Sequence, residues 1–196
     1  MKIGVFGTGV VGRTLASKLV SLGHDVRLGS RTAANPAAGE WAEAEGERAS
    51  CGTFQAAAAS ADFLFNCTPG QVSLAVLSSI PGDTLVGKVL VDVANPLDFS
   101  GGFPPSLSVV NTDSLGEQIQ RALPETCVVK ALNTLSVDVT VDPGQLGARH
   151  DIFIAGNDGD AKQQVRSLLV AFGWRSDDVH DLGGITAARA TEMYLP

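Results

Sequence analysis

Three glycines near the amino terminus have the spacing of a phosphate-binding loop. The run Gly7-Thr8-Gly9-Val10-Val11-Gly12 matches Gly-x-Gly-x-x-Gly and lies between a short apolar run, residues 3–6, and a helical pattern. In such a loop the first glycine permits a tight turn, the second lets a pyrophosphate approach the backbone, and the third lets helix and strand pack closely. The helix that follows presents unpaired N–H groups and its positive dipole end to the phosphates. The context indicates a dinucleotide site, and a glycine-rich turn without a ligand is the alternative.

The end of the second predicted strand indicates which dinucleotide binds. A site for NAD places an acidic residue about 20 residues after the glycine loop, to accept from the ribose 2′-hydroxyl. Here that place reads Gly29-Ser30-Arg31-Thr32, and the next acid is Glu40. Arg31 can bind a 2′-phosphate through charge-assisted hydrogen bonds, with Ser30 and Thr8 as further donors. We therefore predict NADP(H), and a solvated surface arginine is the alternative interpretation of Arg31.

Three further strand ends should meet the same crevice, because ligands of open α/β sheets bind at the carboxyl ends of the strands. We expect Cys67-Thr68-Pro69 beside the ribose and pyrophosphate, and Ala94-Asn95-Pro96 beside the nicotinamide ribose. The run that includes Lys130 and Ala131 ends in two hydrogen-bonding side chains, Asn133-Thr134. Turn and helix-cap chemistry explains all three equally well from spacing alone.

Short β-branched runs alternate with helical patterns along the chain, which is typical of parallel βαβ units. We expect strands at residues 3–6, 24–29, 62–67, 88–93, 126–132 and 151–155. We expect helices at residues 11–22, 36–45, 56–59, 72–80, 114–123 and 161–172, and a surface loop at 98–108. The predicted fold class is α/β, a doubly wound and mostly parallel Rossmann sheet with a small C-terminal α/β lobe. Residues 1–125 form the core of the domain and residues 126–196 complete it.

Composition excludes several classes of protein. Of 196 residues, 44% are hydrophobic and 18% charged, so the chain can bury a core and is not disordered. A net charge of −7 speaks against a nucleic-acid partner. No apolar run approaches the ~20 residues of a membrane span, and the strand-like start at Met1 leaves no room for a signal peptide. The three cysteines have no Cys-x-x-Cys spacing. We expect a soluble cytoplasmic protein without a disulfide framework or a bound metal.

Several runs together have the order and spacing of one family. These runs are KIGVFGTGVVG, GSRT, FNCTPGQV, VDVANP, VVKALNT and the terminal MYLP. On them the chain resembles the F420-dependent NADP oxidoreductases, whose relatives include the reductase domains of the STEAP metalloreductases. The pair of ANP and VKALNT is more specific than the glycine loop. One departure is Asn35, where members often carry a second basic residue shortly after the Ser-Arg pair.

The resemblance implies a cytoplasmic homodimer in which a Rossmann domain with a small C-terminal lobe binds NADP(H). Its implied reaction is hydride transfer between NADPH and the deazaflavin coenzyme F420, with the acceptor pocket completed by residues 126–196. Carried over by motif, Thr8, Gly9, Val10 and Val11 bind the pyrophosphate, and Ser30 and Arg31 bind the 2′-phosphate. Thr68, Val72, Asn95 and Ala131 then line the nicotinamide half.

Hydride transfer between stacked rings needs positioning more than a protein acid or base. We therefore expect no protein nucleophile, and we name Asn133 as the candidate for positioning the rings by hydrogen bonds. The Cys67 thiol should be inert, and the three histidines should be structural or on the surface. We expect the charge of Lys130 at the crevice edge, paired with an acceptor phosphate or with a neighbouring acid. Two alternative functions stay open: NADPH-dependent reduction of a flavin, quinone, carbonyl or imine, and a non-catalytic NADP-binding sensor.

Overall fold

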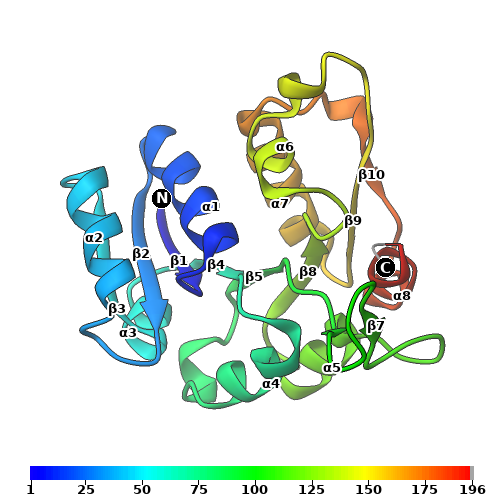
Figure 1. Ribbon diagram of the computed structural model, residues 1–196, viewed down its shortest axis with the longest axis horizontal. Coiled ribbons are helices and arrows are strands. Elements are labelled where there is room, and N and C mark those ends of the chain that lie inside the picture. The colour runs from blue at the N-terminus through cyan, green and yellow to red at the C-terminus, as the bar shows by residue number, and fades with distance from the viewer. Residues whose placement is uncertain (195–196) are drawn as a thin grey trace.

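The computed structural model describes residues 1–194 (Figure 1), and Leu195 and Pro196, the end of the MYLP run, lie outside the described residues. The main sheet is built from strands β1 Lys2–Phe6, β2 Asp25–Ser30, β3 Ala49–Thr53, β4 Phe63–Asn66, β5 Val89–Asp92, β8 Cys127–Ala131, β9 Ile152–Gly156 and β10 Val179–Asp181. A separate antiparallel pair consists of β6 Leu97–Asp98 and β7 Ser106–Leu107.

The order of the main sheet is β10-β9-β8-β5-β4-β1-β2-β3. The six strands from β3 to β8 run parallel, in the order of a doubly wound dinucleotide-binding fold. Strand β9 pairs antiparallel with β8, and β10 pairs parallel with β9. The predicted fold class is thus confirmed, since β9 and β10 extend a parallel core with a small C-terminal addition.

Helices cover both faces of the sheet. They are α1 Val10–Ser21, α2 Pro36–Glu45, α3 Phe54–Ala59, α4 Gly70–Ser78, α5 Leu115–Ala122, α6 Val137–Val141, α7 Gly159–Phe172 and α8 Ala188–Met193. Short 3₁₀ turns lie at Gly82–Thr84, Pro143–Leu146, Ser176–Asp178 and Ile185–Ala187. None of the helices described in residues 1–194 is long and apolar enough to cross a membrane.

Alternating side chains of the strands feed two separate cores. On one face, residues such as Val5 and Val91 pack with α1, α2 and α7. On the other, residues such as Leu64 and Leu90 pack with α3, α4, α5 and Ala188 of α8 (Figure 1). Because both faces are covered, the central strands are nearly continuous apolar runs. The polar residues that end these runs are therefore conspicuous.

The expected elements agree closely with the structure where local signals are strong. Helix α2 begins and ends as predicted: the Asn35 side chain accepts from the Ala38 N–H at 3.1 Å, Pro36 occupies the first turn, and Gly46 follows the last residue. The expected surface loop at 98–108 is partly wrong, because its two ends pair as the ribbon of β6 and β7. Elements β3, α6, β10 and α8 were not predicted.

Candidate functional site

One cavity collects most of the side chains that the sequence singled out. It has a volume of about 840 Å³ and follows the carboxyl ends of the parallel strands. At one end lie Ser30, Arg31 and Phe54, and at the other lie Phe99 and Asn133. The cavity therefore spans from the end of β2 to the end of β8, across the strand ends of the core.

The glycine loop forms the wall of this cavity at the start of α1. Gly7 has φ +116°, and a Cβ there would lie 2.6 Å from the Cys67 carbonyl oxygen, so a side chain is excluded. At Gly12 a Cβ would lie 2.1 Å from the Gly7 oxygen, which explains the close contact of helix and strand. At Gly9 an added Cβ would meet no atom within 4 Å. No side chain caps α1, and Val10 is 66% exposed, so its first N–H groups face an open space.

The end of β2 supplies a cation that forms no hydrogen bond or ion pair within the described residues. Arg31 is exposed, and neither a hydrogen bond nor an ion pair joins its guanidinium to any residue from 1 to 194. Ser30 is buried, and its hydroxyl donates to the Thr32 carbonyl at 2.5 Å. The side chain of Asn35 is engaged in capping α2. Arg31 is thus the group at this end that is free to bind an anion.

At the other end of the cavity, two asparagines join the ends of β5 and β8. Asn95 Nδ2 donates to the Asn133 carbonyl at 2.8 Å, and Asn133 Nδ2 donates to Asn95 Oδ1 at 2.9 Å. Leu132, between β8 and Asn133, has φ +66°, an uncommon value for a residue with a branched side chain. At Gly70 a Cβ would lie 2.0 Å from the backbone carbonyl oxygen of Asn95, so the start of α4 is in direct contact with the end of β5.

All of the predicted binding residues line the cavity except Gly12, Pro96 and Ala131. Gly12 lies behind the loop as a packing residue, and Ala131 is fully buried because its side chain points into the core under α7. The residues that sequence reasoning missed include Phe54, Gln71, Leu97, Phe99, Leu132, Leu135, Val137 and Thr140. Leu132 and Leu135 directly flank the predicted Asn133, so extending that motif would have found them.

The position expected for Lys130 is wrong in part. Its side chain is fully buried and lies outside the cavity, with Nζ 2.8 Å from both Asp92 Oδ2 and Glu192 Oε1. Burial disfavours its charged form, but the two carboxylates outweigh burial and raise the pKa of Lys130. The alternative of a neighbouring acid is the one that the structure bears out.

The cavity carries little acid–base chemistry of its own. Its only titratable side chains within residues 1–194 are Arg31 and Cys67. Burial, with a contribution from the Asp92 charge, raises the pKa of the Cys67 thiol far above its ordinary value, so no thiolate forms near neutral pH. Thr140 adds a buried hydroxyl for which the described residues offer no hydrogen-bond partner. The site can therefore bind and position, but it holds no poised general acid.

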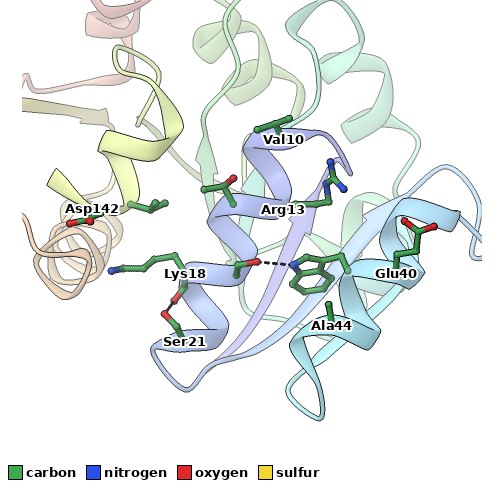
Figure 2. Close-up of a pocket in the computed structure, with 11 residues that line it drawn as sticks. Val10, Arg13, Lys18, Ser21, Glu40, Ala44 and Asp142 are labelled. Atoms are coloured by element: carbon green, nitrogen blue, oxygen red, sulfur yellow. Dashed lines mark hydrogen bonds between the residues drawn. The ribbon is translucent and has the colours of Figure 1, made fainter. Parts of the chain in front are cut away.

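A second hollow of about 720 Å³ lies between α1, α2 and α6 (Figure 2). Figure 2 shows Glu40 on the α2 side, and Lys18 and Asp142 on the α6 side. Trp41 Nε1 donates to the Ser17 hydroxyl at 3.0 Å, which packs α2 on α1. The charged residues that line this second hollow are of both signs, and Val10 is the only predicted binding residue among those that line it. The chemistry expected from the sequence thus concentrates in the first cavity.

A doubly wound sheet with an open glycine loop at its first crossover places the molecule among the Rossmann dinucleotide-binding proteins. The family model described as "NADP oxidoreductase coenzyme F420-dependent" matches residues 2–96. An F420-dependent NADP reductase of Methanothermobacter marburgensis is 31% identical, over 100% of this chain and 90% of that protein. The chain belongs to this family, and it is an NADP-dependent oxidoreductase.

Two further relatives extend the comparison. A crystal structure of a provisionally assigned F420-dependent NADP-reductase from Arthrobacter sp. FB24 superposes with a TM-score of 0.94 at 48% identity, covering 100% of this chain and 90% of that one. The rat metalloreductase STEAP3 is 29% identical over 97% of this chain, which spans only 36% of that protein. A reductive aminase from Aspergillus terreus shares the fold alone, with a TM-score of 0.70 at 20% identity over 99% of this chain and 59% of that one.

Proposed function

We propose that the protein transfers a hydride between NADPH and the deazaflavin coenzyme F420. The observation that carries this proposal is the far half of the cavity, which is lined mostly by apolar side chains, with neutral polar groups such as Asn95 and Asn133 and, among the described residues, no ionisable group beyond the Cys67 thiol. Reduction of a carbonyl normally requires a protein acid beside the oxygen, whereas a planar ring acceptor requires close stacking. The M. marburgensis relative, named an F420-dependent NADP reductase, supports the same acceptor.

The residues at the near end fit a dinucleotide that carries a 2′-phosphate. The open space at Gly9 and the uncapped start of α1 suit a pyrophosphate, since both phosphates are anions that need N–H donors. Arg31 is an unengaged cation at the end of β2, where an NAD site would place an acid. We propose that Thr8, Gly9, Val10 and Val11 hold the pyrophosphate and that Arg31 holds the 2′-phosphate, with Ser30 beside it.

The residues at the far end would position the two rings. Asn95 and Asn133 fix each other through two hydrogen bonds, so the Asn133 Oδ1 atom, which accepts none from the described residues, is held in a defined direction. Thr68 and Val72 follow the end of β4, and Phe99 comes from the end of β6 with 57% of its surface exposed. When bound, NADPH supplies the hydride and the deazaflavin accepts it with one proton from water. The protein's part is to align the rings and to exclude side reactions.

The test is an absorbance assay of the purified protein with NADPH and oxidised coenzyme F420. Parallel reactions contain NADH in place of NADPH, and FMN, a quinone or a cyclic imine in place of F420. We expect rapid loss of deazaflavin absorbance with NADPH and little with NADH. NADPH binding with turnover of another acceptor would reassign the substrate, and binding without any turnover would favour a sensor.

We also propose that the protein is a homodimer, on the family resemblance. Sedimentation equilibrium should give a mass of two 20.2 kDa chains. A mass of one chain that persists at micromolar concentration would contradict this assembly.

A further inference from the structure

A buried row of polar side chains crosses the sheet directly below the far half of the cavity. Asn66, Asp92 and Lys130 are the in-register residues at the ends of the neighbouring strands β4, β5 and β8. All three are essentially excluded from solvent, on the face covered by α4, α5 and α8. Asn66 Nδ2 donates to Asp92 Oδ1 at 2.8 Å, and Lys130 Nζ lies 2.8 Å from Asp92 Oδ2. We call these three residues the polar row.

The polar row holds the backbone of residues that line the cavity. Asn66 Oδ1 accepts from the Thr68 hydroxyl at 2.6 Å and from the Thr68 N–H at 3.3 Å. Both backbone polar groups of Ala94 are held: its N–H donates to Asp92 Oδ1 at 3.3 Å, and its carbonyl accepts from Lys130 Nζ. The position of the cavity wall therefore depends on where the Lys130 ammonium lies.

Glu192 of α8 completes the row from the far side. Its carboxylate is 1% exposed, and Oε1 lies 2.8 Å from Lys130 Nζ. The same carboxylate accepts from the Leu115 N–H at 2.9 Å and the Gly116 N–H at 3.0 Å, at the start of α5. Figure 1 shows α8 beside α5, although the two helices are far apart in the sequence. Removing this carboxylate would leave Lys130 with one anionic partner and two buried N–H groups without an acceptor.

We infer that Glu192 is a positioning residue for the acceptor half of the site, acting through Lys130 on the Ala94 peptide. This inference rests on the proposed function for the identity of the acceptor, but not for the mechanical connection. The chain of contacts runs from α8 through Glu192, Lys130 and Asp92 to residues 93–95 and 66–68. Within the described residues, neither Arg31 nor residues 8–11, which are proposed to hold the phosphates, form a hydrogen bond with this chain of contacts, although Gly7 packs against it at Cys67. The binding of NADPH through its phosphates should therefore be much less sensitive to Glu192 than the binding of the acceptor.

Arg189 offers a matched control on the same short helix. It binds Glu117 of α5 through two hydrogen bonds of 2.6 and 2.8 Å, so it also docks α8 on α5. Within the described residues, neither Arg189 nor Glu117 forms a hydrogen bond or an ion pair with the polar row. If Glu192 only docks α8 on α5, substitution of Glu192 and substitution of Arg189 should have the same effect. If Glu192 positions the cavity wall, only substitution of Glu192 should change the wall.

The experiment compares Glu192→Gln and Arg189→Gln in the 196-residue chain by hydrogen exchange and by steady-state kinetics. For Glu192→Gln we expect amide exchange at residues 93–97 and 130–135 to rise at least fivefold, with residues 7–13 unchanged. The KM for the acceptor that the wild type reduces should rise at least fivefold, with the Kd for NADPH within twofold. Arg189→Gln should raise exchange only in α5 and α8 and leave both constants within twofold.

Two outcomes would overturn the inference. One is a rise in exchange that stays confined to α5 and α8 in Glu192→Gln, and the other is an equal loss of NADPH and acceptor affinity. If the wild type reduces no acceptor, the proposed function fails, but the exchange pattern still decides the role of Glu192. If Glu192→Gln does not fold, Glu192→Asp retains the charge and withdraws the carboxylate by one methylene, and the same pattern is expected at smaller amplitude.

Discussion

Helices α1 and α5 begin with the same backbone feature and use it in opposite ways. Each presents unpaired N–H groups and a positive dipole end. At α5 the Ser114 hydroxyl accepts from the Glu117 N–H at 3.1 Å, and the Glu192 carboxylate fills the remaining donors. At α1 the N-cap residue is Gly9, which has no side chain to cap the helix, and the space in front of it is open. We call the start of α5, which the Glu192 carboxylate occupies, the filled site, and the uncapped start of α1 with the cavity in front of it the open site. The comparison shows that the side chains nearby decide whether the first N–H groups of a helix are satisfied within the protein.

The largest effect on stability should come from removing the Glu192 carboxylate from the start of α5. Glu192→Ala leaves Lys130 buried with one counter-charge and exposes two N–H groups to a cavity, so we expect a loss of about 3–5 kcal/mol in the free energy of unfolding. Urea denaturation measures it. Glu43→Ala on the exposed face of α2 is the matched control and should change stability by less than about 0.5 kcal/mol. A loss as small as that of the control would show that α5 needs no internal anion.

Adding a methyl group at the uncapped start of α1 should have the opposite effect, because it should weaken NADPH binding and leave stability nearly unchanged. Gly9→Ala places a methyl group where no protein atom lies within 4 Å, and its φ of −74° suits alanine. We expect NADPH affinity to fall about a hundredfold, or about 2.7 kcal/mol, with stability nearly unchanged. Fluorescence titration and urea denaturation measure the two quantities. Gly12→Ala should instead destabilise the fold, because its Cβ would lie 2.1 Å from the Gly7 oxygen. Unchanged NADPH binding by Gly9→Ala would remove the pyrophosphate from α1.

Local signals predicted much of the fold and of the open site. The glycine loop, the polar strand ends and the Asn35-Pro36 start of α2 are contiguous in sequence, so their structural meaning is visible without tertiary contacts. Strand β3, with the sequence ASCGT, was missed because it is a half-buried edge strand without an apolar run. Helix α6, with the sequence VDVTV, is rich in β-branched residues and forms a helix against its propensity while packing beside α1.

The filled site could not be predicted for a different reason. Lys130 follows Asp92 by 38 residues in sequence, and Glu192 contacts Leu115 across 77, so no local spacing connects these groups. From the sequence alone, a lysine at a strand end beside a predicted phosphate ligand is a reasonable candidate for the crevice. Only the register of β5 and β8 and the docking of α8 show that its charge is satisfied internally.

Arg31 should report on the specificity of the open site. Arg31→Ala removes the free cation at the end of β2, so NADPH binding should weaken by about 1.5–3 kcal/mol while NADH binding stays nearly constant. Titrations with both nucleotides measure this difference. Equal losses would mean that Arg31 supports the loop and does not contact the 2′-phosphate.

A smaller effect is expected from the cap of the filled site. Ser114→Ala removes the hydroxyl that accepts from the Glu117 N–H, so the free energy of unfolding should fall by about 1 kcal/mol. The Kd for NADPH should not change, because Ser114 lies outside the cavity in which we propose that the nucleotide binds. A higher Kd for NADPH in Ser114→Ala would show that the starts of α1 and α5 are coupled, and it would contradict the distinction between them.

The smallest effect concerns the pair that docks α8 on α5 beside the filled site. The Arg189 guanidinium, by hydrogen bonding and against the opposing effect of burial, lowers the pKa of Glu117. A carboxyl whose folded-state pKa is depressed stabilises the protein above its unfolded pKa and loses that contribution as pH falls through the folded value. Arg189→Gln should therefore lower the Tm slightly at neutral pH, and the two proteins should converge below the ordinary range of a glutamate pKa. Thermal melts at several pH values measure this. A difference in Tm that persists in acid would show that Arg189 acts through packing of its stem and not through its charge.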